Sequence, residues 1–87
     1  MLVSKQTIDA LNWQIRSQVA HCYRVAIDAE GEQLKVVTWL KWPEFTDLFR
    51  IVYCLDGLLT DDHYLLAQIA NVIKAEAEAE RKRQTAA

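Results

Sequence analysis

The sequence predicts an α+β fold: an N-terminal helix, an antiparallel β-hairpin, a short helix for which a third strand is the alternative, and a long C-terminal helix. Apolar residues recur every three or four positions near both ends of the chain and alternate with polar residues in the middle. The composition, 52% hydrophobic and 25% charged, is typical of a globular protein. A length of 87 residues leaves room for one small domain spanning 1–87.

The first helix is expected from about Thr7 to Ala20. Its apolar residues are spaced so that they stack on one face: Ile8, Leu11, Ile15 and Val19. Ser4 or Thr7 can cap the first turn by accepting a hydrogen bond from a backbone N–H.

The hydrophobic period then changes to two, which predicts a hairpin. Tyr23, Val25 and Ile27 alternate with polar or small residues, and a second β-rich run covers 34–40. Gly31 lies between the two runs, where a tight turn needs a positive φ. The second run is apolar on both faces, with Leu34, Val36 and Leu40 on one and Val37 and Trp39 on the other. One face is expected to pack against the helices.

Residues 43–57 fit two secondary structures. Pro43 and Glu44 suit the first turn of a helix, and Gly57 suits its C-terminal end. An apolar stripe at helical spacing lies between them: Phe45, Leu48, Phe49, Val52 and Leu55. The alternative makes residues 49–55 a strand, because Phe, Ile, Val and Tyr favour pleated surfaces. The periodicity and the end signals favour the helix.

The C-terminal helix has the clearest start. Thr60 is expected to be its N-cap, and Asp61 and Asp62 place negative charge where the helix dipole favours it. Its apolar stripe is expected to comprise Leu65, Leu66, Ile69, Val72, Ile73 and Ala77. Residues 75–87 contain no large apolar side chain, so this segment is expected to be an exposed, frayed helical tail.

The residues with the most reactive side chains do not form a recognisable site. His21 and Cys22 are adjacent, and Cys54 and His63 are nine positions apart, whereas zinc sites pair their ligands at short spacings. Cys54 lies in an apolar run, which disfavours the thiolate that catalysis needs. We therefore expect no catalytic residue, no metal and no cofactor, and a protein that is not an enzyme.

The N-terminus lacks the basic start and long apolar run of a signal peptide, and no apolar stretch is long enough to span a bilayer. Together with two cysteines in no disulfide pattern, this predicts a cytoplasmic protein that does not interact with a membrane.

A nucleic-acid-associated regulator is the alternative function. Its candidate residues are Lys35, Lys41, Arg81, Lys82 and Arg83. If residues 49–55 form a strand, the element order is similar to that of double-stranded RNA-binding domains, although no sequence motif supports the similarity. Those domains present basic residues at a helix start, whereas the last helix here begins with Asp61 and Asp62. The pI near 5.6 also argues against nucleic acid as a partner.

The aromatic residues instead suggest a small protein-interaction module. Aromatic side chains are enriched in interface cores. The candidates here are the tryptophans Trp39, Trp42 and Trp13, together with the neighbouring Val37. A two-stranded sheet is marginal on its own, so pairing of two copies across a two-fold axis is expected to complete it. The expected protein is a homodimer that binds a further, unidentified protein through the hairpin and its aromatic surface.

Overall fold

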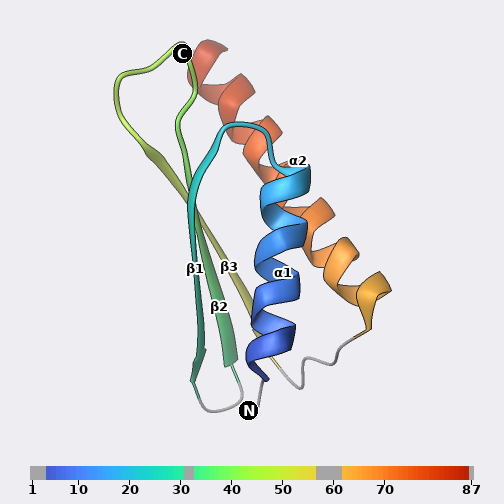
Figure 1. Cartoon of the computed structure of the whole chain (residues 1–87). Helices are drawn as coiled ribbons and strands as arrows, with labels where there is room; N and C mark the ends of the chain where they lie inside the picture. The colour runs from blue at the N-terminus through green and yellow to red at the C-terminus, as the bar shows by residue number, and fades with distance from the viewer. Residues whose placement is uncertain (1–3, 31–32, 57–61, 87) are drawn as a thin grey trace.

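The computed structural model describes residues 4–30, 33–56 and 62–86. They form two helices and three strands in the order helix, three strands, helix (Figure 1). The elements are α1 (Lys5–Gln18), β1 (Cys22–Glu30), β2 (Gln33–Leu40), β3 (Phe49–Asp56) and α2 (His63–Ala86). The predicted α+β class is therefore confirmed.

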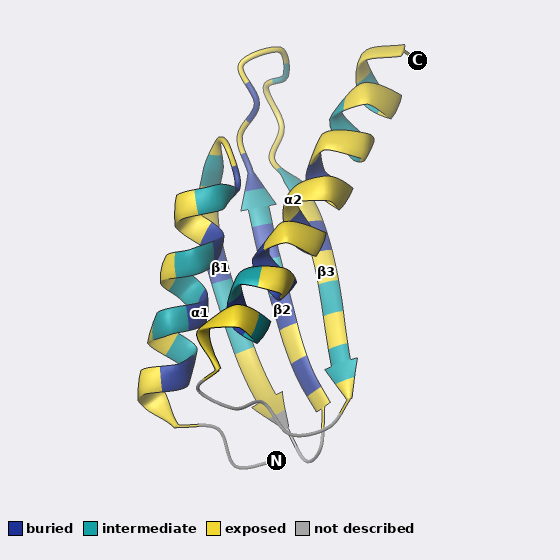
Figure 2. Ribbon diagram, turned by 90° about the vertical axis from the view of Figure 1, so that its right-hand side faces the viewer, coloured by how far each residue is buried: buried dark blue, intermediate teal, exposed yellow. Residues whose placement is uncertain are grey.

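The three strands form one antiparallel sheet in the order β1-β2-β3, with β2 in the centre. Both helices lie on the same face of this sheet (Figures 1 and 2). Helix α1 packs against α2 and β1, whereas α2 also contacts β3. No described helix or strand covers the opposite face, which we call the open face.

The expected short helix at 43–55 is wrong, and the alternative strand is present as β3. Phe49, Ile51, Tyr53 and Leu55 alternate along β3 and lie on the face that carries the helices. They are paired in register with Leu40, Thr38, Val36 and Leu34 of β2. Pairing with β2 satisfies backbone groups and places four large side chains on the helix-covered face, which outweighs the local helical spacing.

Pro43 lies in a turn, not at the start of a helix. The backbone N–H of Phe45 donates to the carbonyl of Trp42 at 3.2 Å, which places Pro43 at the second position of a four-residue turn. Proline is favoured there because its ring fixes the φ angle that the turn requires. The same preference for a fixed φ makes proline common in the first turn of helices, so the residue itself did not distinguish the two structures.

The helix starts are capped by short polar side chains. Ser4 accepts a hydrogen bond from the N–H of Thr7 at 3.1 Å, as one of the two predicted caps of α1. At α2 the side chain of Asp62 accepts from the N–H of Tyr64 at 2.9 Å, so Asp62 occupies the capping position expected for Thr60. Thr60, Asp61, the predicted turn residue Gly31 and the predicted helix C-cap Gly57 lie outside the described residues.

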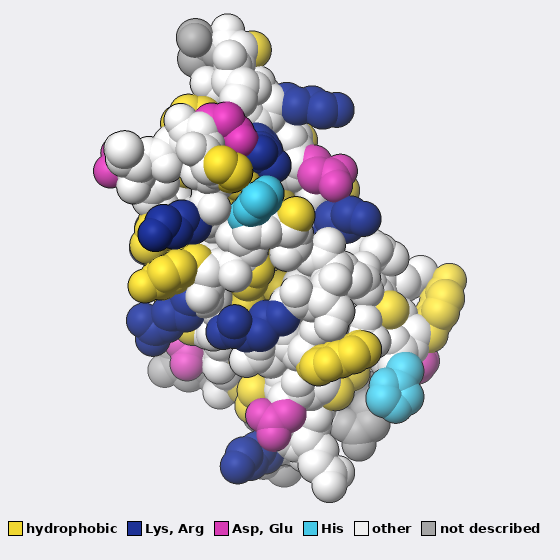
Figure 3. Space-filling model, turned by 45° about the horizontal axis from the view of Figure 1, so that its top comes forward, with side chains coloured by type: hydrophobic (Ala, Val, Ile, Leu, Met, Phe, Trp, Pro, Cys, Tyr) yellow, Lys and Arg dark blue, Asp and Glu magenta, His cyan; other side chains and the backbone are white. Residues whose placement is uncertain are grey.

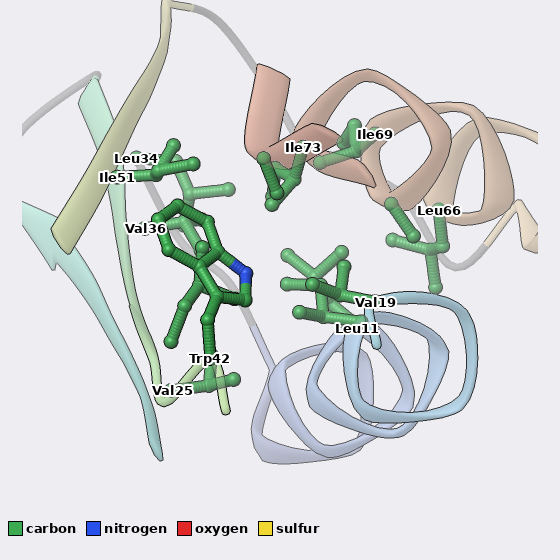
Figure 4. Close-up of a cluster of buried hydrophobic side chains, with 14 residues drawn as sticks. Leu11, Val19, Val25, Leu34, Val36, Trp42, Ile51, Leu66, Ile69 and Ile73 are labelled. Carbon is green, nitrogen blue, oxygen red and sulfur yellow. The ribbon is translucent and has the colours of Figure 1, made fainter. Parts of the chain in front are cut away.

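The core lies between the sheet and the helices (Figure 4). From α1 and its C-cap it takes Leu11, Ile15 and Val19, while Ile8 is only half-buried. From α2 it takes Leu66, Ile69, Ala70, Ile73 and Ala77. The stripe predicted for α2 is confirmed apart from Val72, which is 43% exposed, and Ala70, which is buried in addition.

The C-terminal segment is helical up to Ala86, and two contacts tie it to the rest of the molecule. Ala77 is buried in the same cluster as Trp42, and the guanidinium of Arg81 pairs with the carboxylate of Glu44. Most other side chains of this segment are exposed, and fraying of its end stays a prediction. Neither described helix combines the length and the apolar character that a membrane span requires.

Candidate functional site

Rows of residues run across β1, β2 and β3 on the open face of the sheet; three of these rows form the candidate site, and the register continues beyond them to the pair Gln33–Asp56. The strand registers define the rows. The three are Arg24–Trp39–Arg50, Ala26–Val37–Val52 and Asp28–Lys35–Cys54. The first is basic and aromatic, the second is apolar, and the third pairs opposite charges on neighbouring strands. Six of the nine side chains are exposed and three, Ala26, Val37 and Trp39, are half-buried.

An irregularity in β1 aligns the first row. Cys22 pairs with Leu40 but Arg24 pairs with Trp39, so Tyr23 is an extra residue at this point of the strand. Without this bulge, Tyr23 would stand opposite Trp39. The guanidinium carbon of Arg24 lies 5.2 Å from the centroid of the Trp39 ring, within the range of a cation–π interaction. Bulges commonly redirect a side chain in this way at binding surfaces.

Charge is distributed unevenly along the open face. Arg24 and Arg50 flank Trp39 at one end, and Lys41 is exposed just beyond the end of β2. Asp28 and Asp56 lie toward the other end. Figure 3 shows Lys and Arg side chains beside hydrophobic ones along the left of the molecule, the side on which the sheet lies. The face therefore has a basic, aromatic end and an end that carries its acids.

The structure brings two of the four predicted interface residues together. Val37 and Trp39 are neighbours along β2 on the open face, as alternation predicted. Trp13 is 66% exposed but belongs to α1, in the helical layer. The expectation for Trp42 is wrong, because it is only 2% exposed and lies in the core. Figure 4 shows its indole ring directed toward side chains of the helices, so no partner can reach it.

The residues of the nucleic-acid alternative are divided between the two layers. Lys35 lies on the open face and Lys41 just beyond it, whereas the other three lie on α2. Arg81 pairs with Glu44 and Arg83 pairs with Glu80, and Lys82 is exposed. The hydrogen bond from Arg81 is the main cause that lowers the pKa of Glu44, and the same contact raises the pKa of Arg81. Two of the five bases are therefore already neutralised by carboxylates.

The cysteines are free and lie on opposite edge strands. Cys22 is half-buried at the start of β1, where burial raises the pKa of its thiol, although Arg16 and the carbonyl of Arg24 lower it to a smaller extent. Cys54 is exposed on β3. Within 4–30, 33–56 and 62–86, no three His, Cys, Asp or Glu side chains lie close enough to hold a metal ion.

Sequence reasoning missed Arg24 and Arg50, the two bases beside Trp39. Arg24 is aligned with Trp39 only through the bulge at Tyr23, for which the sequence has no local signal. Arg50 belongs to β3, which was expected to be a helix. Alternation of Arg50, Val52 and Cys54 with larger apolar residues was the available signal, since it is the pattern of a strand with one exposed face.

Comparisons with protein-family models, curated proteins and solved structures find no match to this chain. With β3 present, the element order is the one noted above for double-stranded RNA-binding domains. The described start of α2, however, consists of Asp62, His63 and Tyr64, without the Lys or Arg side chains that would contact phosphates across a groove. The open face is therefore the feature from which a function is argued.

Proposed function

We propose that this chain is a non-enzymatic protein-interaction domain that forms a homodimer through the open face of its sheet. The observation that carries the proposal is the row order on that face: a basic aromatic row, a central apolar row and a row of opposite charges. Sheets with an apolar strip on an uncovered face are commonly completed by packing against a second sheet.

A two-fold axis between the sheets, perpendicular to the strands and passing over Val37, makes the open face complementary to itself. The apolar row of each copy then packs on the same row of the other. The axis reverses the strand direction, so Arg24 faces the partner's Asp28. Trp39 likewise faces the partner's Lys35. Each of these contacts occurs twice, as in any isologous interface.

The opposite arrangement, with the axis along the strands, is disfavoured by charge. It would place the row containing Arg24 and Arg50 against the same row of the partner, and like charges in a desolvated contact are costly. The polarity of the open face therefore selects one orientation of the two copies. The three rows are about 6.8 Å apart and the strands about 4.8 Å apart, so the contact is small and we expect a micromolar dissociation constant.

Charge reversal tests this arrangement. Arg24→Asp or Asp28→Arg alone places like charges opposite each other in both symmetric contacts, and we expect either change to weaken the dimer about tenfold or more. The double variant Arg24→Asp/Asp28→Arg restores opposite charges and is expected to recover most of the affinity. Lys82→Asp, at an exposed base on α2, is the control for the change in net charge.

Sedimentation equilibrium from about 1 μM to about 1 mM measures the dimer constant of each variant. A wild-type protein that is monomeric throughout would overturn the proposal, as would a double variant no tighter than the single ones. A monomer that binds a single-stranded oligonucleotide with a salt-dependent affinity lost in Trp39→Ala would support the nucleic-acid alternative instead.

A further inference from the structure

A groove of about 390 Å³ lies between the outer edge of β3 and the C-terminal half of α2. One wall is the first half of β3, 49–52. The other consists of one face of α2, with Glu76, Ala79, Glu80 and Arg83 at helical spacing. We call this feature the β3–α2 groove; it shares Arg50 and Val52 with the open face, and its α2 residues lie outside that face.

The outer edge of β3 offers unpaired backbone hydrogen-bonding groups to the β3–α2 groove. β3 pairs with β2 on one side only, and no described residue makes a backbone hydrogen bond to its other side. Alternate N–H and C=O groups of an edge strand point outward and can pair with another extended chain. Natural sheets usually protect such an edge with charges, a bulge or a covering element.

The position of α2 fits one added strand. Figure 2 shows α2 crossing the start of β3 obliquely, with its C-terminal half continuing past the edge and the end of the sheet, so α2 overhangs only the first part of the place that a fourth strand would occupy. The seven residue steps from Glu76 to Arg83 rise about 10 Å. The three steps from Phe49 to Val52 span about the same length. The two walls are therefore of similar length, about that of four extended residues.

A second copy of this chain fits the β3–α2 groove less well than a single strand does. If two copies paired through β3, the partner's β3 would bring its own α2 over the helix-side face of the added strand. A separate segment of another protein brings no such helix, so α2 alone would lie over it.

We propose that the β3–α2 groove binds an extended peptide segment of a partner protein, which adds to the sheet beside β3 as a fourth strand. Main-chain hydrogen bonds to the edge of β3 would supply the affinity, and alternate side chains would supply the specificity. Inward-pointing positions of the peptide lie near Ile51 and Ala79, which favours an aliphatic side chain. Glu76 and Arg50 both line the groove, are exposed and make no ion pair among the described residues, which favours a basic side chain near Glu76 and an acidic one near Arg50.

The test uses a phage-displayed library of random heptapeptides, selected on the wild-type protein and counter-selected on Ala79→Arg. Ala79 is exposed, so the larger side chain fills the β3–α2 groove without disturbing the core. We expect Ala79→Arg to weaken the selected peptides about tenfold or more. Ala75→Arg, the same change at an exposed α2 position that does not line the groove, is expected to have less than about a twofold effect.

The selected peptide is then synthesised with one N-methyl group at each backbone amide in turn. Only every second amide of an added strand donates to β3, so methylation is expected to abolish binding at alternate positions. Loss of binding without this alternation, or the absence of any peptide that discriminates against Ala79→Arg, would overturn the inference.

The dissociation constant of the Ala79→Arg homodimer distinguishes the peptide-binding groove from the proposed open-face dimer. We expect it to equal that of the wild type, because the proposed dimer uses the open face. Dissociation of the dimer by Ala79→Arg would mean that a second copy occupies the β3–α2 groove, and the peptide proposal would then be wrong. A monomeric wild-type protein that still binds the selected peptide would retain this inference and overturn only the homodimer.

Discussion

The rings of Trp42 and Phe49 lie with their centroids 4.7 Å apart, inclined by 33°, and join the loop after β2 to the start of β3. Phe45 completes the cluster, with its ring centroid 5.1 Å from that of Phe49 and 6.0 Å from that of Trp42. Tilted aromatic pairs at these separations add to the free energy of burial. The cluster fixes the path of the chain between the two strands and seats Trp42 beneath the helices.

We expect Trp42→Ala to lower the free energy of unfolding by about 3–5 kcal/mol, because it removes a large buried side chain and leaves a cavity. Trp13→Ala, which changes a side chain that is 66% exposed, is the matched control and is expected to change stability by no more than about 0.5 kcal/mol. Urea denaturation followed by circular dichroism measures both. Similar losses for the two variants would contradict the assignment of Trp42 to the core.

Most of the fold follows from local patterns, and the exception shows where such patterns fail. The stripe through Leu11 and Ile15 and the alternation along β2 identify their elements without reference to the rest of the chain. In contrast, Phe49 and Leu55 fit both the helical stripe and the alternation of a strand. Pairing with β2 decides between them, and that is a contact between segments that the local sequence does not contain.

Alternation predicted the facing of residues along β1 and β2 of the open face, but not how the rows align across the three strands. Alternation along β2 places Val37 and Trp39 on the face opposite Leu34, as expected. Arg24 reaches Trp39 through a bulge, and Arg50 through a strand that was expected to be a helix. Burial of Trp42 depends on contacts with residues distant in the sequence, including Ala77. The missing information was tertiary in all three cases.

Thr38 provides a test of core polarity. It is fully buried at the centre of the helix-covered face, and its hydroxyl has no hydrogen-bond partner among the described residues. Thr38→Val keeps the shape of the side chain and removes the unsatisfied hydroxyl, so we expect it to raise the free energy of unfolding by about 1 kcal/mol. Thr38→Ser retains the hydroxyl and loses a methyl group, and it is expected to be destabilising by about 1 kcal/mol. Guanidinium denaturation would contradict this view if Val were the less stable of the two.

The contact between Glu44 and Arg81 predicts a pH dependence of stability. The hydrogen bond from Arg81 lowers the pKa of Glu44 below its ordinary value of 4.5 in the folded protein. A carboxyl whose pKa is lower in the folded state stabilises that state above the unfolded pKa, and the contribution is lost as the pH falls through the folded pKa. We therefore expect Glu44→Gln to be less stable than the wild type at pH 7 and to converge with it in acid below pH 4.5.

Carbon-13 NMR of the Glu44 carboxyl measures this pKa directly. In Arg81→Gln the pKa of Glu44 should rise toward its ordinary value, because the principal cause of the shift has been removed. Glu76→Gln removes an exposed carboxylate on α2 that is not part of this contact, and it controls for the change in net charge caused by Glu44→Gln in the stability measurement. An unchanged Glu44 pKa in Arg81→Gln would show that the two side chains do not interact in solution.

His21 connects α1 to β1 in a backbone conformation that glycine adopts more easily. Its φ is 60°, and it is the one non-glycine residue with a positive φ within 4–30, 33–56 and 62–86. The conformation is held by the N–H of Lys41, which donates to the carbonyl of His21 at 2.9 Å. This bond ties the start of β1 to the end of β2, so the strained position helps to set the register in which Arg24 meets Trp39.

We expect His21→Gly to stabilise the fold by up to about 1 kcal/mol, since the relief of the left-handed strain exceeds the entropy that glycine loses on folding. The neighbouring Ala20 does not have a positive φ, so Ala20→Gly incurs only the entropic cost and is expected to be destabilising by about 0.5 kcal/mol. Thermal unfolding followed by circular dichroism would separate the two variants, with His21→Gly unfolding above the wild type and Ala20→Gly below it. Equal destabilisation by both glycines would mean that His21 stores no strain.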